Sequence, residues 1–248
     1  MKYKAILFDA DETLFDFKKA EREAFKNTMI EFGFDYDESY HFSIYKEIND
    51  AIWKELEEGL ITQSKLKIER FKRFSDKLEV KFDENEFATS YMKHLGNGSF
   101  LFDGAEKLIE DLSYKYTLSI VTNGLTAVQE NRIKKSVIAK YFKDIVISEE
   151  LGISKPNPGI FEYAINNIGD FSKDEVLMIG DSLSSDIRGG INYNIDTCWF
   201  NPNNIENKTD LSPTYEISDF NGIRDLLLNT KPNVTPKHNP SGNFIITK

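Results

Sequence analysis

Apolar residues gather in short unbroken runs at several places along the chain, and each run gives way to a polar cluster. Runs without polar alternation are typical of strands that are buried on both faces, as in a parallel sheet. They predict strands over 4–8, 117–121, 145–147, 176–179 and 197–200. Apolar residues at helical spacing predict helices over 105–114, 127–140, 158–167 and 184–192. Strands that alternate with helices in this way predict an α/β fold with a doubly wound parallel sheet.

The segment after the first predicted strand breaks this alternation. Its aromatic and aliphatic residues fall three and four positions apart with Lys and Glu between them, as at Ile44, Ile48 and Ile52. This spacing predicts amphipathic helices and no strand. We therefore expect a helical domain to be inserted into the α/β sheet.

These patterns predict the domain boundaries. The α/β core is expected to comprise 1–15 and 99–230, and the helical insert 16–98. Three prolines and several asparagines predict an irregular tail over 231–248.

The charge and composition of the chain limit the classes of partner that it is expected to bind. The chain of 248 residues has a net charge of -10, which opposes binding to a nucleic-acid polymer or to an anionic membrane. An anionic substrate would need cations supplied locally by the site. No stretch approaches the ~20 apolar residues of a membrane span. The single cysteine, Cys198, excludes an internal disulfide and favours a reducing cytoplasmic location, whereas the choice between monomer and homodimer stays open.

Polar groups follow four of the predicted strands. They include Asp9 with Asp11, Thr122 with Asn123, and Asp181, while Lys155 lies a little beyond a fourth strand. In an open α/β sheet, functional groups collect at the carboxyl ends of the strands. The sequence therefore predicts that these residues converge on one site.

The two aspartates after the first strand point to metal and acid–base chemistry. Carboxylates about 4.5 Å apart at an effective dielectric of about 20 repel by about 4 kcal/mol, and a hard cation such as Mg²⁺ relieves that repulsion. Such a site can hold one carboxylate as a nucleophile and leave the other as a proton donor, with their pKa values split by the environment. The alternative is an acidic cluster that caps a turn.

The other strand ends each have a functional and a structural interpretation. Thr122, Asn123 and the following glycine can donate to phosphate oxygens, but polar turns after strands are ordinary loops. Lys155 can serve as a point charge for a phosphoryl group, or be one of many surface lysines. Asp181 is the better metal ligand and Asp186 could support it, yet either could simply cap a helix.

Together these residues resemble the four ordered motifs of the haloacid-dehalogenase superfamily. The resemblance rests on Asp9-Ala10-Asp11-Glu12-Thr13, the strand that ends in Thr122, Lys155, and Gly180-Asp181 with Asp186. It covers the whole predicted core, which it implies to be Rossmann-like. The insert falls where the superfamily has its helical type-1 cap.

The resemblance also implies roles. Asp9 attacks phosphorus to form an aspartyl-phosphate, and Asp11 protonates the leaving oxygen and later deprotonates water. Asp9, the main-chain carbonyl of Asp11 and Asp181 hold Mg²⁺. Two further sets complete the implied site: Thr122, Asn123 and Lys155 bind the phosphoryl group, and Thr13 and Asp186 support the ligands from behind.

Within the superfamily, the chain resembles the pyrimidine-type nucleoside 5′-monophosphatases. This resemblance rests on residues 8–17, on 146–157 and 186–192, and in the insert on Asn49, Trp53, 59–62 and 70–71. It implies a small phosphomonoester as substrate, with a nucleotide favoured. Phe17, Asn49 and Trp53 are candidate substrate contacts, although the aromatics could equally be helix-packing core and Asn49 and Arg70 could bond within the insert.

Other functions of the same fold stay open to different degrees. The superfamily's dehalogenases lack an acid at the position of Asp11, which disfavours halide displacement. A sugar-phosphate phosphatase or a β-phosphoglucomutase-like phosphomutase keeps both aspartates and is the enzymatic alternative. A non-catalytic binding module is disfavoured because no motif is missing.

Overall fold

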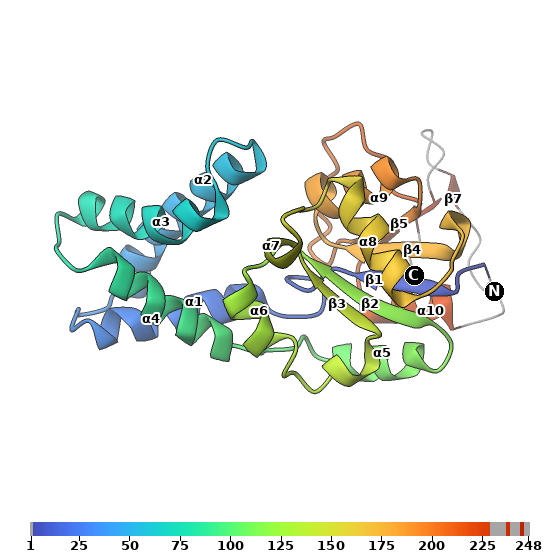
Figure 1. The fold of residues 1–248 in the computed structure, drawn as a ribbon, viewed down its shortest axis with the longest axis horizontal. Coiled ribbons are helices and arrows are strands. Elements are labelled where there is room, and N and C mark those ends of the chain that lie inside the picture. Colours follow the sequence, from blue (N-terminus) through green and yellow to red (C-terminus); the bar gives the residue numbers. More distant parts are fainter. Residues whose placement is uncertain (1, 229–236, 239–243, 246–248) are drawn as a thin grey trace. The chain divides into compact units, whose positions relative to one another are not determined.

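The computed structural model describes residues 2–228, 237–238 and 244–245, and the chain folds into two compact units (Figure 1). The sheet unit comprises Met1–Asp16, Leu101–Gly124 and Ile133–Lys248. The helical unit comprises Phe17–Phe100 and Leu125–Arg132. Leu125–Arg132 therefore belongs to the helical unit, whereas the sequence pattern placed those residues in the core.

Within the described residues, the sheet has eight strands in the order β3-β2-β1-β4-β5-β6-β8-β7, and all neighbouring pairs are parallel except β7 with β8. This order confirms the predicted α/β class with a parallel sheet. The strands are β1 Ala5–Phe8, β2 Thr117–Thr122, β3 Asp144–Ile147, β4 Val176–Gly180, β5 Asp196–Phe200, β6 Tyr215–Ile217, β7 Lys237–His238 and β8 Phe244–Ile245.

The first five strands match the predicted runs, and the later ones were not predicted. β6 has only three residues, one of them Glu216, so it lacks the unbroken apolar run of the others. The tail expected over 231–248 lies outside the described residues, apart from the four that form β7 and β8.

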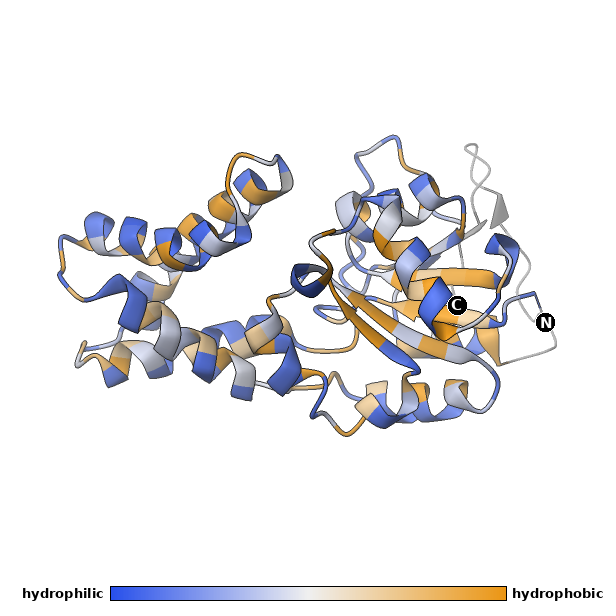
Figure 2. Ribbon diagram, viewed as in Figure 1, coloured by the Kyte–Doolittle hydropathy of each residue, from blue (hydrophilic) through white to orange (hydrophobic). Residues whose placement is uncertain are grey.

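Apolar clusters cover both faces of the sheet. Side chains alternate along a strand, so neighbouring residues of β1 contribute to opposite clusters. Ile6 and Phe8 of β1 belong to the apolar cluster on one face, which α5 (Ala105–Ser113) and α10 (Phe220–Leu227) cover. Ala5 and Leu7 belong to the cluster on the other face, beneath α8 (Pro158–Ile168). The central strands are accordingly among the most apolar parts of the chain (Figure 2).

Two predicted helices differ from the observed ones. The helix expected over 127–140 ends at Arg132 (α6, Thr126–Arg132), and a short 3-10 turn follows at Ala139–Tyr141. Beyond the end of α6, Ile133 and Ile138 are buried in the apolar core of the sheet unit, so this stretch packs on the sheet and α6 packs in the helical unit. The helix expected over 184–192 consists of two pieces, Leu183–Ile187 and α9 (Arg188–Tyr193).

The helical unit is built around a cluster of aromatic side chains. Its other helices are α1 Phe17–Glu31, α2 Ser43–Glu57, α3 Gln63–Leu78 and α4 Glu84–Asn97, with a short turn at Glu38–Phe42. The side chains of Thr62 and Asp83 cap α3 and α4 by accepting backbone N–H groups of the first turn. Phe25 lies centrally, with ring centroids 4.3 Å from Tyr45 and 5.2 Å from Phe74. Among the described residues, no helix is both long and apolar enough to cross a membrane.

Leu7→Ala should destabilise the sheet unit, because Leu7 is fully buried between the central strands and α8. A cavity of this kind costs about 2–5 kcal/mol. Trp199 is the natural reporter because it is buried in β5, and a Trp53→Phe background leaves it as the single tryptophan. Urea unfolding followed by Trp199 fluorescence measures the loss. The exposed Ile205 provides the control, since Ile205→Ala should change stability by no more than about 0.5 kcal/mol; equal losses in both variants would contradict this packing.

Candidate active site

Asp9 directly follows β1 and keeps the hydrogen bonding of the sheet. Its backbone N–H donates to the carbonyl oxygen of Ile179 at 2.8 Å, so β1 and β4 run side by side up to this point. Because β1 lies between β2 and β4, Thr122 at the end of β2 and Asp181 after β4 flank Asp9. Asp9 is buried there, with 6% of its surface exposed.

Lys155 is buried against two carboxylates. Its Nζ lies 2.5 Å from Oδ1 of Asp9 and 2.7 Å from Oδ1 of Asp186, and the residue is 3% exposed. Burial alone would lower the pKa of Lys155, but the attraction of Asp186 and Asp9 outweighs it and raises the pKa above its ordinary value. The lysine is therefore a charged group of the site, and the surface-lysine alternative is wrong.

A third carboxylate, Asp181, lies close to the two that contact Lys155. Ligand oxygens of Asp9, Asp181 and Asp186 lie within 4.8 Å of one another. Burial raises the pKa of Asp9 to about 7, which Lys155 opposes and the neighbouring carboxylates of Asp186 and Asp11 reinforce. Burial, with Asp9 and Asp186 acting in the same direction, raises the pKa of Asp181 to about 8. A buried set of oxygen donors with excess negative charge fits a hard divalent cation.

The loop after Asp9 is a compact turn that places Thr13 between two of these carboxylates. The N–H groups of Leu14 and Phe15 both donate to the carbonyl oxygen of Ala10 at 2.9 Å. The Thr13 hydroxyl accepts the N–H of Asp181 at 3.1 Å and lies 3.5 Å from carboxylate oxygens of Asp9 and Asp181. Thr13 thus links the ends of β1 and β4, which fits the supporting role predicted for it.

Asn123 acts on the backbone of Lys155. Its amide Nδ2 donates to the Lys155 carbonyl at 2.9 Å, and its Oδ1 accepts the Lys155 N–H at 2.8 Å. The side chain was predicted to contact phosphate, and the structure instead has it position the lysine. Next to it, the hydroxyl of the buried Thr122 accepts the N–H of Gly124 at 3.1 Å.

Gly180 allows Asp186 to approach the end of β4. A Cβ atom on Gly180 would lie 2.2 Å from Oδ2 of Asp186, which only glycine avoids. The same oxygen accepts the N–H of Ser182 at 3.0 Å. The cap of the following turn is the Ser182 side chain, so the helix-cap interpretation of Asp186 is wrong. Sequence reasoning missed this need for Gly180; the glycine within an otherwise apolar strand end was the available signal.

The three candidates in the helical unit have different surroundings. Asn49 is 3% exposed, donates to Glu21 Oε1 at 2.9 Å and accepts from Arg70 Nη1 at 3.2 Å. This is the internal hydrogen bonding that was its alternative. Phe17 is partly buried beneath the guanidinium of Arg132, 5.1 Å from its ring centroid. Trp53 is partly exposed on α2.

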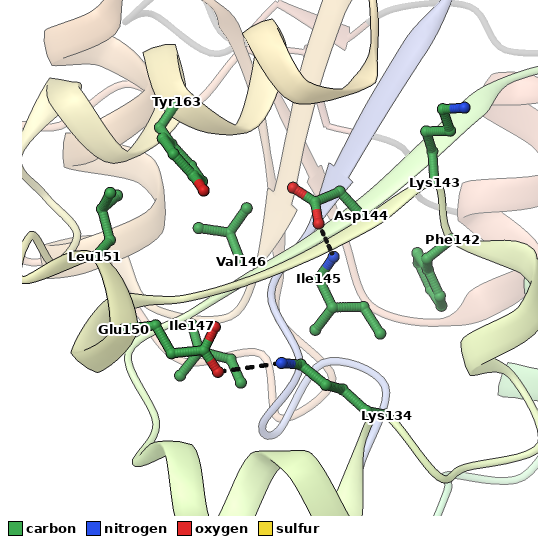
Figure 3. A pocket seen from close by; sticks show the side chains of 10 residues that line it. All are labelled: Lys134, Phe142, Lys143, Asp144, Ile145, Val146, Ile147, Glu150, Leu151 and Tyr163. Atoms are coloured by element: carbon green, nitrogen blue, oxygen red, sulfur yellow. Dashed lines mark hydrogen bonds and ion pairs between the residues drawn. The ribbon is translucent and has the colours of Figure 1, made fainter.

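A cavity of about 380 Å³ lies beside the edge strand β3, apart from these residues (Figure 3). Its charged groups are largely satisfied by their neighbours: Lys134 pairs with Glu150 at 3.1 Å, and Asp144 accepts the N–H of Ile145 at 2.9 Å. None of the predicted site residues lines it.

Residues 6–200 match the profile of haloacid dehalogenase-like hydrolases. The chain belongs to this family. That match confirms the predicted superfamily and the prediction that the protein is an enzyme of the hydrolase class.

Curated relatives and a solved structure agree with the assignment. The chain is 38% identical to pyrimidine 5′-nucleotidase PynA of Streptococcus pneumoniae, over 92% of this chain and 96% of the relative. It is 33% identical to pyrimidine 5′-nucleotidase YjjG of Escherichia coli, over 92% and 99%. The structure of the HAD-hydrolase YfnB from Bacillus subtilis superposes with a TM-score of 0.86 at 34% identity, covering 92% of this chain and all of that one. The predicted resemblance to pyrimidine-type nucleotidases is thereby confirmed as a similarity.

Asp181→Asn should stabilise the metal-free protein progressively as the pH rises. With its pKa raised to about 8, Asp181 keeps a proton in the folded state that the unfolded chain releases above about pH 4. In that window the unfolded state binds fewer protons, so this group lowers wild-type stability as the pH increases. The asparagine does not ionise, and the difference in Tm, variant minus wild type, should grow between about pH 5 and about pH 9.

Thermal unfolding in EDTA across this range measures the difference. Asp103→Asn makes the same chemical change at an exposed aspartate of the same unit and is the matched control. A pH-independent difference for Asp181→Asn would contradict the raised pKa.

Proposed function

We propose that the chain is a Mg²⁺-dependent phosphomonoesterase that works through an aspartyl-phosphate on Asp9, with pyrimidine nucleoside 5′-monophosphates as substrates. The observation that carries the proposal is the buried contact of 2.5 Å between Asp9 and the Lys155 ammonium at the end of the central strand. A carboxylate in this position can serve as a nucleophile, with the lysine beside it as a cation for the group under attack.

The carboxylates divide between binding and positioning. One oxygen of Asp186 lies against the Lys155 ammonium and the other accepts the Ser182 N–H. We therefore assign Asp186 to positioning the lysine and not to binding the metal ion. Asp9, Asp181 and the main-chain carbonyl of Asp11 would hold Mg²⁺. When bound, the ion neutralises charge on the phosphoryl oxygens and lets both buried carboxylates ionise.

The reaction then needs one nucleophile and one proton carrier. The Asp9 carboxylate attacks phosphorus while the ester P–O bond breaks, and Asp11 in its acid form donates its proton to the leaving oxygen. The Asp11 carboxylate next accepts a proton from the water that attacks the aspartyl-phosphate, which releases inorganic phosphate and restores Asp9. Lys155 and the Thr122 hydroxyl stabilise the charge on the transferring phosphoryl group.

The substrate class comes from the relatives. Two relatives that align over more than nine-tenths of this chain are named pyrimidine 5′-nucleotidases, and the Bacillus hydrolase YfnB is described as bound to magnesium. In this acidic chain, Lys155 supplies the local positive charge that an anionic substrate needs.

Asp9→Asn should abolish the Mg²⁺-dependent phosphatase activity and leave the fold intact, because the amide is no nucleophile. A loss of about 10³-fold or more in kcat is expected. Steady-state phosphate release measures it, and mass spectrometry of acid-quenched wild type should detect a phosphorylated peptide that contains Asp9. Asp103→Asn makes the same chemical change at an exposed site and should retain full activity. Unchanged turnover in well-folded Asp9→Asn would overturn the mechanism.

A substrate panel separates nucleotidase from phosphomutase. We expect Mg²⁺-dependent phosphate release from uridine, deoxyuridine and thymidine 5′-monophosphates, with kcat/KM at least about tenfold above that for purine nucleotides and hexose phosphates. Conversion of a hexose 1-phosphate to the 6-phosphate, followed by NMR, tests the alternative. Isomerisation without phosphate release would replace the proposed function with a phosphomutase.

A further inference from the structure

The buried indole of Trp199 contacts the backbone of a proposed metal ligand. Trp199 lies in β5 and is 3% exposed, and its Nε1 donates to the main-chain carbonyl of Asp181 at 2.8 Å. An indole nitrogen can only donate, and a buried one usually finds an acceptor. The roles in phosphoryl transfer of Asp9, Asp11 and Lys155 make no use of this hydrogen bond, which acts on Asp181.

The ladder of the sheet does not reach Asp181. β4 ends at Gly180, and the pairing of β4 with β5 ends at the same point, where Gly180 lies opposite Trp199. Asp181 is the next residue, so its carbonyl lies beyond the last pair of the two neighbouring strands (Figure 1). The Trp199 side chain supplies a donor at this position and extends the contact between β4 and β5 by one residue.

Gly180 explains why Asp181 needs such support. Glycine lacks the Cβ atom that restricts the backbone of other residues, so local preference fixes the direction of the next residue poorly. A side chain is excluded here, because a Cβ atom on Gly180 would lie 2.2 Å from Oδ2 of Asp186. The close approach of Asp186 therefore places the least restricted type of residue directly before Asp181. The direction of the Asp181 carboxylate then depends on contacts from other parts of the chain.

Two side chains hold the backbone of Asp181, one on each side. The Thr13 hydroxyl accepts its N–H at 3.1 Å, and Trp199 donates to its carbonyl at 2.8 Å. Asn123 holds the N–H and the carbonyl of Lys155 in a similar way. Both ionisable residues are thus fixed through their backbones by uncharged side chains that come from other parts of the chain.

Trp199 is a rigid donor because its own strand is held firmly. β5 pairs with β4 on one side and with β6 on the other. Cys198 and Phe200, the neighbours of Trp199 along the strand, are buried in the apolar cluster that α5 and α10 cover. Side chains alternate along a strand, so Trp199 projects to the opposite face. Its large side chain has only two rotatable bonds, and burial in a paired strand fixes the position of the N–H group.

We propose that Trp199 is a positioning residue that orients Asp181 for Mg²⁺ binding. The role of Asp181 as a ligand rests on the proposed function, whereas the hydrogen bond from Trp199 rests on the structure. Mg²⁺ demands nearly ideal octahedral geometry, so a ligand that is free to turn binds it less well. Hydrogen-bond partners that orient metal ligands commonly contribute about 10–100-fold to metal affinity.

Trp199→Phe tests this role, because it removes the N–H group and keeps an aromatic ring. We expect the Kd for Mg²⁺, measured by isothermal titration calorimetry without substrate, to rise about tenfold or more. In phosphate release from uridine 5′-monophosphate, the Mg²⁺ concentration that gives half the maximal rate should rise by the same factor. The kcat at saturating Mg²⁺ should stay within about twofold, which a general loss of structure would not allow.

Tyr116→Phe is the matched control. The Tyr116 hydroxyl donates to the carbonyl of Leu227 in the same unit, so this variant also removes a buried donor to a main-chain carbonyl. Tyr116 precedes β2 and therefore lies at the amino ends of the parallel strands, whereas Asp181 lies at their carboxyl ends. The control should leave the Kd for Mg²⁺ within about twofold.

An isosteric replacement covers the case in which Trp199→Phe does not fold. In a Trp53→Phe background, Trp199 is the single tryptophan, and it can be replaced by benzothienylalanine during expression. This analogue carries sulfur in place of the N–H group and keeps the two-ring shape. It should weaken Mg²⁺ binding as Trp199→Phe does.

Indole NMR follows the hydrogen bond itself. In the same Trp53→Phe background, the Trp199 N–H gives the single indole resonance. Titration with Mg²⁺ should shift this resonance saturably, with the Kd found by calorimetry. Asp181→Asn should remove the saturable shift at the same concentrations. A Trp199 resonance that does not move at saturating Mg²⁺ would contradict the coupling.

The outcomes separate this inference from the proposed function. An unchanged Kd in Trp199→Phe, or an equal rise in Tyr116→Phe, would overturn the role of Trp199 and leave the Mg²⁺ site standing. Wild-type protein that binds no Mg²⁺ would overturn the Mg²⁺ dependence of the proposed function, and this inference with it.

Discussion

The buried ammonium group of Lys155 is the constraint on which the arrangement of the site depends. A desolvated charge is tolerated only with close counter-charges, and Asp9 and Asp186 provide them at 2.5 and 2.7 Å. Each partner in turn depends on the fold. The position of Asp9 depends on β1 lying between β2 and β4, and that of Asp186 on the missing Cβ of Gly180. The backbone of Lys155 is held by one hydrogen bond that it accepts from the Asn123 amide and one that it donates to it.

The same cluster accounts for how an acidic chain would bind the anionic substrate proposed for it. Net charge acts over long distances and is screened, whereas reactivity depends on charges within a few ångströms. The carboxylates of Asp9, Asp181 and Asp186 exceed the charge of the single ammonium beside them, and burial raises the pKa of Asp9 and Asp181 in response. A group of oxygen donors with this imbalance fits a divalent cation.

The helical unit also buries charged side chains, Glu21 and Arg70. Its aromatic cluster would specify little orientation by itself, because apolar contacts are not directional. Glu21, Asn49 and Arg70 form a chain of hydrogen bonds across it, and the Arg70 guanidinium lies over the rings of Phe71 and Tyr91. The polar chain fixes the register of α1, α2 and α3, and it leaves Asn49 engaged inside the unit.

The sequence by itself determined the elements whose cause is local. Unbroken apolar runs predicted the first five strands, helical spacing predicted the insert, and polar residues at strand ends marked Asp9, Asp11, Thr122, Lys155 and Asp181 as candidates. It did not determine the end of α6, the role of Asn123, the need for glycine at position 180 or the short strand β6. Those depend on partners remote in the chain: Lys155 and Asp9 are separated by 146 positions, and Asn123 and Lys155 by 32. The spacing of apolar residues in the sequence shows which face of a helix or strand is buried. Only the folded sheet determines which residues of different strands come within hydrogen-bonding distance.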